Sequence, residues 1–202
     1  MKIFIINGGQ HFAHSGGKFQ ETLTQWTADF FEQELKAEVK VTNINDEYDL
    51  QQEVDKFVWA DAIIYHTPVW WFDMPYMLKE YIDKVFTTGH ENGIYRNDGR
   101  SRRSDNPKLH YGTGGLLHGR KYMLTTSWNA PIEAFTVEGE FFNLHDEDAV
   151  FMGMHKMNHF IGLEQIDGFH FHEMEKGVTP EKIEQDKAEY LAHLRKSFFP
   201  TV

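Results

Sequence analysis

Short runs rich in aliphatic and aromatic residues alternate with longer amphipathic segments along the whole chain. Five such runs predict strands, at residues 2–6, 39–44, 62–65, 121–126 and 166–171. The segments between them repeat apolar residues at helical spacing and predict helices at about 17–36, 50–59, 74–86, 150–161 and 180–198. Strands that alternate with helices build a parallel sheet covered on both faces. The sequence therefore predicts an α/β protein.

The number and order of these elements narrow the fold further. Five strands favour a flavodoxin-like sheet of order 2-1-3-4-5, and the Rossmann dinucleotide-binding order is the main competitor. We expect the 202 residues to form a single domain, since no linker or repeat divides them. Residues 88–119 interrupt this alternation of strands and helices, since they contain seven glycines and show little apolar periodicity. A loop of this length is usually functional or disordered.

Charge and composition exclude several kinds of function. The chain carries 31 acidic against 20 basic residues, a formal net charge of -11, which disfavours binding to nucleic acid or to an anionic membrane. It contains no cysteine, so disulfides and thiolate chemistry are excluded. It has no transmembrane-length apolar run, and its apolar start is too short for a signal peptide. We therefore expect a cytoplasmic protein that inserts into no membrane.

The loop after the first predicted strand, residues 7–18, has the composition of an anion-binding loop. Four glycines, the hydroxyl of Ser15 and a helix start place backbone N–H groups where a phosphate can meet them, and Ser15 is the expected helix cap. The loop is not a nucleotide P-loop, because Phe12 and Phe19 stand where that motif needs Gly and Ser or Thr. Its length leaves room for a pyrophosphate, and a glycine-rich turn without a ligand is the alternative.

Two further loops carry aromatic residues directly after predicted strands. Residues 67–75 include Trp70, Trp71 and Phe72, and residues 127–131 include Trp128. Large aromatic side chains are unusual on exposed connections, so we expect them to wall a flat ring, with an apolar lid or a subunit contact as the alternative. All three loops fall at the carboxyl edge of the predicted sheet, where such folds bind ligands.

Several motifs resemble those of flavodoxin-like NAD(P)H:quinone oxidoreductases, and most closely the bacterial modulator of drug activity B family. The resemblance extends from Ile5-Ile6-Asn7-Gly8 to the last helix. Its most specific stretches are Phe12-Ala13-His14-Ser15, Trp59-Ala60-Asp61, Pro68-Val69-Trp70-Trp71, Tyr81-Ile82-Asp83, Tyr111-Gly112-Thr113-Gly114-Gly115-Leu116 and Trp128-Asn129-Ala130-Pro131-Ile132-Glu133-Ala134-Phe135-Thr136.

The resemblance implies FAD as cofactor and NAD(P)H as co-substrate. It implies that the phosphates and ribityl chain are held by Ser15, Gly16, Gly17, Lys18, Phe19, Gln20, Glu21 and Thr22. It assigns the isoalloxazine ring to Val69, Trp70, Trp71, Phe72, Tyr111, Ser127, Trp128, Asn129 and Ala130. Val69 replaces an expected glycine, which alters the wall under the flavin. Gln10-His11 replace expected lysines, which weakens the expected preference for NADPH over NADH.

The implied reaction is two-electron reduction of a quinone by NAD(P)H, with ping-pong hydride transfer through flavin N5. Backbone donors of Trp128 and Asn129 are expected to stabilise negative charge at the N1–O2 edge of the ring. No catalytic acid or base is assigned, and Tyr111 is the candidate for binding a quinone oxygen. The alternatives are an FMN electron carrier of flavodoxin type and a regulatory subunit of a potassium-efflux transporter.

The remaining signals are weaker. Residues 91–120 hold six basic against three acidic residues, which suits either steering of an anionic cofactor or a solvated loop. His155 with His159, and His170 with His172, have zinc-ligand spacing, but we predict no metal site. Residues 146–148 are acidic and predict a helix start. The apolar surface around residues 69–77 predicts a homodimer whose active site lies at the interface.

Overall fold

Five parallel strands form one sheet in the computed structural model, which describes residues 1–13, 15–176 and 178–199. His14 of the predicted first-loop motif lies outside these residues. The strands are β1 (Lys2–Asn7), β2 (Glu38–Asn43), β3 (Ala62–Pro68), β4 (Lys121–Ser127) and β5 (Glu164–Phe171), in the order β2-β1-β3-β4-β5. This order confirms the flavodoxin-like prediction over the Rossmann alternative.

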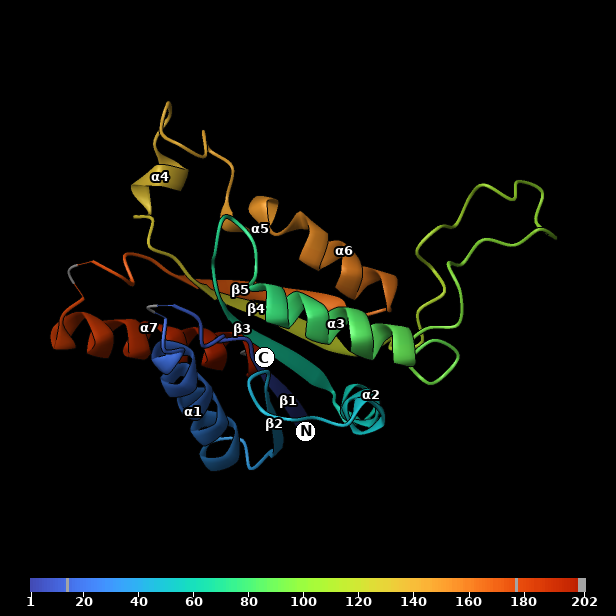
Figure 1. The fold of residues 1–202 in the computed structure, drawn as a ribbon, viewed down its shortest axis with the longest axis horizontal. Helices are drawn as coiled ribbons and strands as arrows, with labels where there is room; N and C mark the ends of the chain where they lie inside the picture. The colour runs from blue at the N-terminus through green and yellow to red at the C-terminus, as the bar shows by residue number, and fades with distance from the viewer. Residues whose placement is uncertain (14, 177, 200–202) are drawn as a thin grey trace.

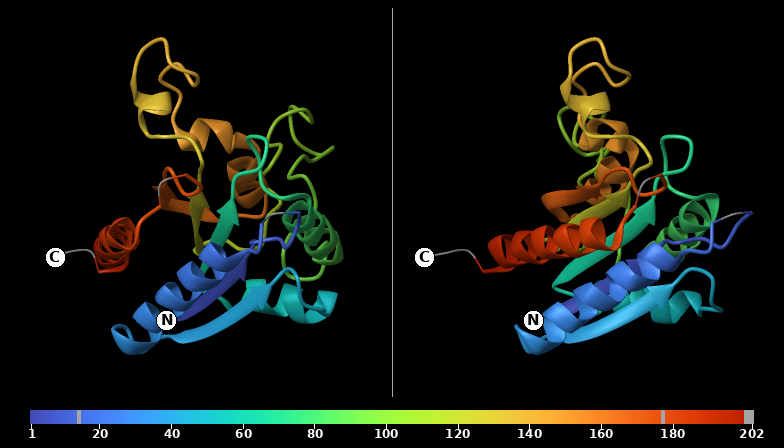
Figure 2. Two further views of the ribbon diagram at one scale, coloured as in Figure 1. Left: turned by 60° about the vertical axis from the view of Figure 1, so that its left-hand side comes forward. Right: turned by 90° about the vertical axis from the view of Figure 1, so that its left-hand side faces the viewer.

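Helices cover both faces of the sheet (Figures 1 and 2). One face is covered by α1 (Lys18–Gln33) and α7 (Pro180–Phe198), the other by α2 (Leu50–Trp59), α3 (Tyr76–Thr88) and α6 (Met152–Phe160). The single helix predicted at 150–161 is instead split into α5 (Glu147–Val150) and α6, because Phe151 leaves the helical conformation between them. The short α4 (Glu133–Thr136) follows β4.

The core explains why the central strands are so apolar. All seven residues of β3 are buried, and so are Ile3 to Ile6 of β1, because a helical layer packs on each side of them. Two helices begin where the sequence provides a capping side chain. The Asp49 carboxylate accepts from the Gln52 N–H at the start of α2 (2.9 Å), and the Asp146 carboxylate accepts from the Ala149 N–H at the start of α5 (2.8 Å).

Two excursions leave the sheet at opposite edges (Figure 1). Residues 131–146, which we call the aromatic arm, follow β4 at the carboxyl edge. The 89–120 loop follows α3 and is fastened at the amino edge, where Leu117 N–H donates to the Ile161 carbonyl (3.0 Å) just before β5. No helix within the described residues is long and apolar enough to cross a bilayer.

Candidate active site

The first turn of α1 is open toward the carboxyl edge of the sheet. The helix starts after Gly17, whose φ of 65° lies in the left-handed region, and no side chain in the described part of the chain caps it. The prediction that Ser15 caps this helix is therefore wrong. Ser15 lies two residues before the cap position and pairs with Phe12 through backbone hydrogen bonds. The N–H groups of an uncapped first turn are free to bind an anion.

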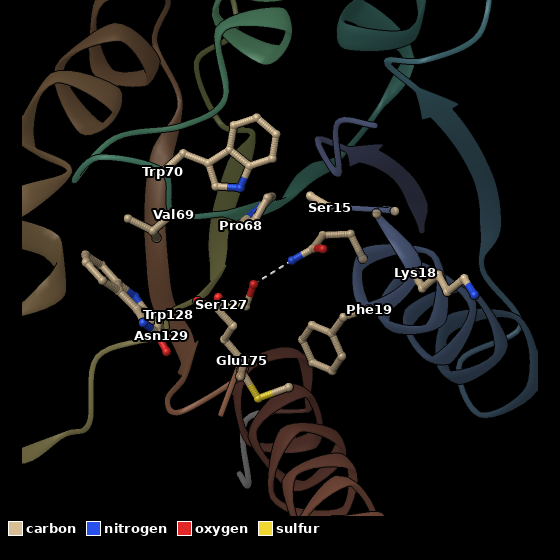
Figure 3. A pocket seen from close by; sticks show the side chains of 14 residues that line it. Ser15, Lys18, Phe19, Pro68, Val69, Trp70, Ser127, Trp128, Asn129 and Glu175 are labelled. Atoms are coloured by element: carbon tan, nitrogen blue, oxygen red, sulfur yellow. Dashed lines mark hydrogen bonds between the residues drawn. The ribbon is translucent and has the colours of Figure 1, made fainter. Parts of the chain in front are cut away.

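A cavity of about 370 Å³ lies between this turn and the ends of β3, β4 and β5 (Figure 3). It is lined by Ser15, Gly16, Gly17, Lys18, Phe19, Gln20, Pro68, Val69, Trp70, Ser127, Trp128, Asn129, Met174 and Glu175. The side chain of Lys18 points away from the cavity, whereas the ring of Phe19 points toward it. The backbone and not a lysine therefore provides the positive pole of this site.

One buried hydrogen bond joins the two sides of the cavity. The side-chain amide of Gln20 on α1 donates to the hydroxyl of Ser127 at the end of β4 (2.6 Å; Figure 3). Both residues are buried. Because this bond joins residues far apart in the sequence, it fixes the distance between the helix start and the β4 loop.

The segment after β4 is held from behind by its neighbour strand. Trp128 N–H donates to the Phe171 carbonyl (2.8 Å), and Met174 N–H donates to the Trp128 carbonyl (2.8 Å). The indole N–H of Trp128 donates to the Thr126 hydroxyl (2.7 Å), which also lies 2.7 Å from Nδ1 of His170. These bonds use the Trp128 backbone donor, so the expectation that it faces a flavin edge is wrong.

Trp71 and Phe72 form the tip of a tight hairpin. Trp70 and Asp73 exchange backbone hydrogen bonds of 2.8 and 3.1 Å, and both tip residues have positive φ, 50° and 67°. Bulky residues rarely adopt this conformation, which costs roughly 1–2 kcal/mol each. The Trp71 side chain is 93% exposed. The strained backbone of this hairpin therefore holds a large aromatic side chain in solvent.

The structure brings most of the predicted cofactor residues together. Eleven of the seventeen line the cavity, and Trp71, Phe72 and Ala130 line a neighbouring one. Three residues lie elsewhere: Glu21 and Thr22 are exposed on α1, and Tyr111 lies in the 89–120 loop at the amino edge, with its ring 5.7 Å from that of Phe160. A single copy of the chain therefore does not place Tyr111 in the cavity.

Three lining residues were not among the predicted site residues: Pro68, Met174 and Glu175. Met174 and Glu175 follow β5. The signal was available, because a parallel sheet brings the end of its fifth strand to the same edge as the ends of the other four.

The paired histidines contact carboxylates beside this site. His155 Nε2 lies 3.1 Å and His170 Nε2 lies 3.7 Å from Asp148 Oδ1, and His172 Nε2 lies 2.8 Å from Glu147 Oε1. The hydrogen bond from His155 lowers the pKa of Asp148, and burial lowers the pKa of His170. Within the described residues, no group of three or more potential ligands is arranged to hold a metal ion.

Known proteins share both the fold and much of this sequence. Residues 1–194 match the family described as having a flavodoxin-like fold. NADPH:quinone oxidoreductase MdaB of Haemophilus influenzae is 43% identical over 198 residues, which cover 98% of this chain and all of that protein.

Solved structures agree on the fold. A proposed quinone reductase from Klebsiella pneumoniae aligns with a TM-score of 0.72 at 21% identity, over 98% of this chain and 86% of that one. General stress protein 14 of Treponema denticola, solved in complex with FMN, aligns with a TM-score of 0.64 at 20% identity, over 96% of each chain. This chain therefore belongs to the flavodoxin-like family that includes the MdaB quinone oxidoreductase of Haemophilus influenzae.

Proposed function

We propose that this protein is a cytoplasmic NAD(P)H:quinone oxidoreductase that uses a bound flavin. The observation that carries the proposal is one cavity that combines an uncapped helix start with aromatic walls. A helix start suits the phosphate of a flavin nucleotide, and flat apolar walls suit its ring system. The 43% identity to a quinone oxidoreductase, over the full length of that protein, supports the same activity.

One further observation supports the fit of the lining residues to a flavin. The backbone N–H groups of Trp71, Phe72 and Asn129 donate to no acceptor in the described part of the chain, although their neighbours Val69, Trp70 and Trp128 do. Three such donors beside the aromatic walls match the polar edge of an isoalloxazine ring, which carries several acceptors. When bound, a flavin would accept a hydride and pass two electrons on. The chain itself would position the reactants and exclude water.

The proposed reaction converts NAD(P)H, a quinone and one proton into NAD(P)⁺ and the quinol. The nicotinamide gives up a hydride, and the quinone gains two electrons and two protons. We assign no residue of the cavity as a general acid or base, because none of its side chains other than Lys18 and Glu175 is ionisable. We propose NADPH as the preferred donor, in keeping with the name of the H. influenzae relative, NADPH:quinone oxidoreductase.

Turnover should follow ping-pong kinetics. Trp70 and Val69 line the cavity, and we expect NAD(P)H and quinone to occupy the space beside them in turn. Initial rates measured against NADPH at several fixed quinone concentrations should give parallel double-reciprocal lines. Lines that intersect to the left of the axis would show that both substrates bind together. Absence of quinone-dependent NAD(P)H oxidation would instead favour an electron carrier.

The flavin should be FAD. The loop from Asn7 to Gly17 is longer than one phosphate requires, and it ends at an uncapped helix start that suits a pyrophosphate. We expect mass spectrometry of the flavin released from purified protein to give FAD in near-stoichiometric amount. Apoprotein offered equal FAD and FMN provides the control, and exclusive retention of FMN would contradict the prediction.

We propose that the active unit is a homodimer. Phe12, Trp71 and Tyr76 expose large aromatic surfaces near the cavity, which is unusual for a monomer. The 89–120 loop projects from the opposite edge of the sheet, and Tyr111 on it is 69% exposed. A two-fold dimer in which this loop reaches the cavity of the other copy would cover the aromatic surface and place Tyr111 beside the substrate.

Sedimentation at micromolar concentration should therefore give twice the 23.7 kDa mass of the chain. Deleting the exposed tip, residues 100–110, should abolish quinone turnover while leaving the fold intact by circular dichroism, because these residues do not pack into the core. A 23.7 kDa species that turns over at the full rate would contradict the dimer.

A further inference from the structure

The aromatic arm, residues 131–146, projects beyond the carboxyl edge of the sheet and forms part of the wall of the site (Figure 1). Its residues Ala134, Phe141 and Phe142 line the cavity that neighbours the first one. Ala130 directly precedes the arm and Glu147 directly follows it, and both contact one side chain of β5. The group that joins these two ends therefore also positions this wall of the site.

That side chain is His172, which contacts the two ends of the arm with its two ring nitrogens. Its Nε2 lies 2.8 Å from Oε1 of Glu147, and its Nδ1 lies 3.3 Å from the carbonyl oxygen of Ala130. A carbonyl oxygen only accepts hydrogen bonds, and so does an ionised carboxylate. A neutral imidazole has one N–H and can donate to one of the two oxygens, whereas an imidazolium donates to both. The geometry therefore fits the doubly protonated ring.

The state of Glu147 supports the same conclusion. Glu147 is buried, and a buried carboxylate is unfavourable unless it is paired. Burial by itself would raise the pKa of Glu147, but the hydrogen bond from His172 helps to bring this pKa below its ordinary value, so the carboxylate is ionised at pH 7. Among the described residues, no lysine or arginine lies within ion-pair distance of it. His172 is therefore the cation that balances this charge.

The groups that surround His172 on other elements do not take its place. From α4, the ring of Phe135 packs against it with centres 5.4 Å apart and carries no charge. On α5, Oδ1 of Asp148 lies 3.1 Å from Nε2 of His155 on α6. On β5, His170 is neutral at pH 7, because burial lowers its pKa. These groups leave His172 as the ring that pairs with the carboxylate at the end of the arm.

We propose that His172 is a positioning residue, which in its doubly protonated form joins the two ends of the aromatic arm and so holds the arm against the site. When the ring loses one proton, it keeps the shorter, charged hydrogen bond to Glu147 and loses the bond to Ala130. The Ala130 carbonyl then keeps the Glu173 N–H, at 3.3 Å, so the start of the arm is held less firmly. The consequence for turnover rests on the proposed quinone reduction.

Three variants distinguish this role from that of a simple ion pair. His172→Gln puts a neutral amide in place of the imidazolium and should leave the arm loose at every pH. Glu147→Gln should keep the arm closed at every pH, because its amide can donate to Nε2 of a neutral ring whose Nδ1–H donates to Ala130. A purely structural ion pair predicts that both variants loosen the arm. His159→Gln, which changes an exposed histidine of α6, is the matched control and should behave as wild type.

Hydrogen–deuterium exchange of residues 131–146 in the flavin-loaded protein measures the loosening. Losing one hydrogen bond changes such an equilibrium about fivefold. Above the pH at which NMR shows that His172 loses its second proton, exchange of the arm in wild type should become about fivefold faster than in Glu147→Gln at the same pH. KM for a quinone should rise by up to about the same factor with the same midpoint, and kcat should change less.

The outcomes separate the inference from the function on which its kinetic part rests. Equal exchange in wild type and both variants at every pH, a His172 ring that is singly protonated throughout, or loosening in both variants would overturn the inference. So would a KM that does not follow the change in exchange, because the arm would then not position the site. Failure to reduce any quinone would overturn the proposed function, while exchange and NMR would still decide whether His172 joins the ends of the arm.

Discussion

Replacing Gly17 with alanine should weaken flavin binding ten- to a hundredfold. Gly17 has a φ of 65°, and a Cβ atom there would lie 2.7 Å from the Gly9 carbonyl oxygen, which is a backbone atom that cannot rotate away. Either the loop or the start of α1 must shift, and the first-turn N–H groups shift with it. Losing one hydrogen bond to a charged phosphate costs about 1.5–3 kcal/mol, which gives this change in affinity.

The measurement is the dissociation constant of flavin from reconstituted apoprotein, together with the flavin content of the protein as purified. Gly119→Ala is the matched control, because Gly119 also has a positive φ, 78°, but a Cβ there meets no atom within 4 Å. The Gly119→Ala variant should lose thermal stability because alanine is strained at a positive φ, but it should bind flavin with unchanged affinity. Equal flavin affinity in the two variants would show that the α1 start does not bind the phosphate.

Buried His66 should make the fold sensitive to mild acid. The ring is fully buried on β3, and burial lowers the pKa of His66 from its ordinary value of 6.5 to about 3. Its Nδ1 lies 2.9 Å from the Thr24 hydroxyl, and its Nε2 lies 3.2 Å from the Thr27 hydroxyl, so neutral partners satisfy a neutral ring. Below pH 6.5 the unfolded chain binds a proton at this position that the folded chain does not bind.

The stability contributed by a neutral His66 is complete above pH 6.5 and is lost as the pH falls toward 3. The free energy of unfolding should decrease by about 1.4 kcal/mol for each pH unit in this window, or about 2 kcal/mol between pH 6.5 and 5. Urea unfolding at several pH values measures this slope. The His66→Gln variant should be less stable at pH 7, and its free energy of unfolding should lack the part of the pH slope that His66 contributes. The His118→Gln variant, which changes an exposed residue, should keep the full slope. Identical slopes for wild type and His66→Gln would contradict the assignment.

The fold was predictable from the sequence because its signals are local and repeated. Strands such as β1 and β3 are continuous apolar runs, and helices such as α3 have a clear apolar face, so the burial pattern of each element follows from its own residues. The predictions were wrong where neighbouring residues, and not the apolar pattern of the element itself, determine where a helix begins or breaks. Phe151 interrupts the predicted helix, and the start of α1 depends on the backbone of Gly17 and not on the nearest hydroxyl residue.

The candidate site was predictable in part, for a related reason. The parallel order of strands brings the loops after β1, β3 and β4 together whatever their side chains do, so residues such as Ser15 and Trp70 were found from position alone. Side-chain contacts across the sheet were not predictable: nothing in the sequence pairs Gln20 with Ser127. The position of Tyr111 depends on the path of a long loop without periodicity, which local patterns do not determine.

The Gln20–Ser127 hydrogen bond also bears on how the protein is made. The cavity draws on segments from Ser15 through to Glu175, so its last wall is translated only when most of the chain already exists. Contacts between such distant segments form late in folding, because closing a long chain is entropically slow. A ligand that needs the complete cavity can therefore bind only after these last segments have been translated. Its binding then stabilises the folded chain by mass action, so its supply affects how much of the protein stays folded.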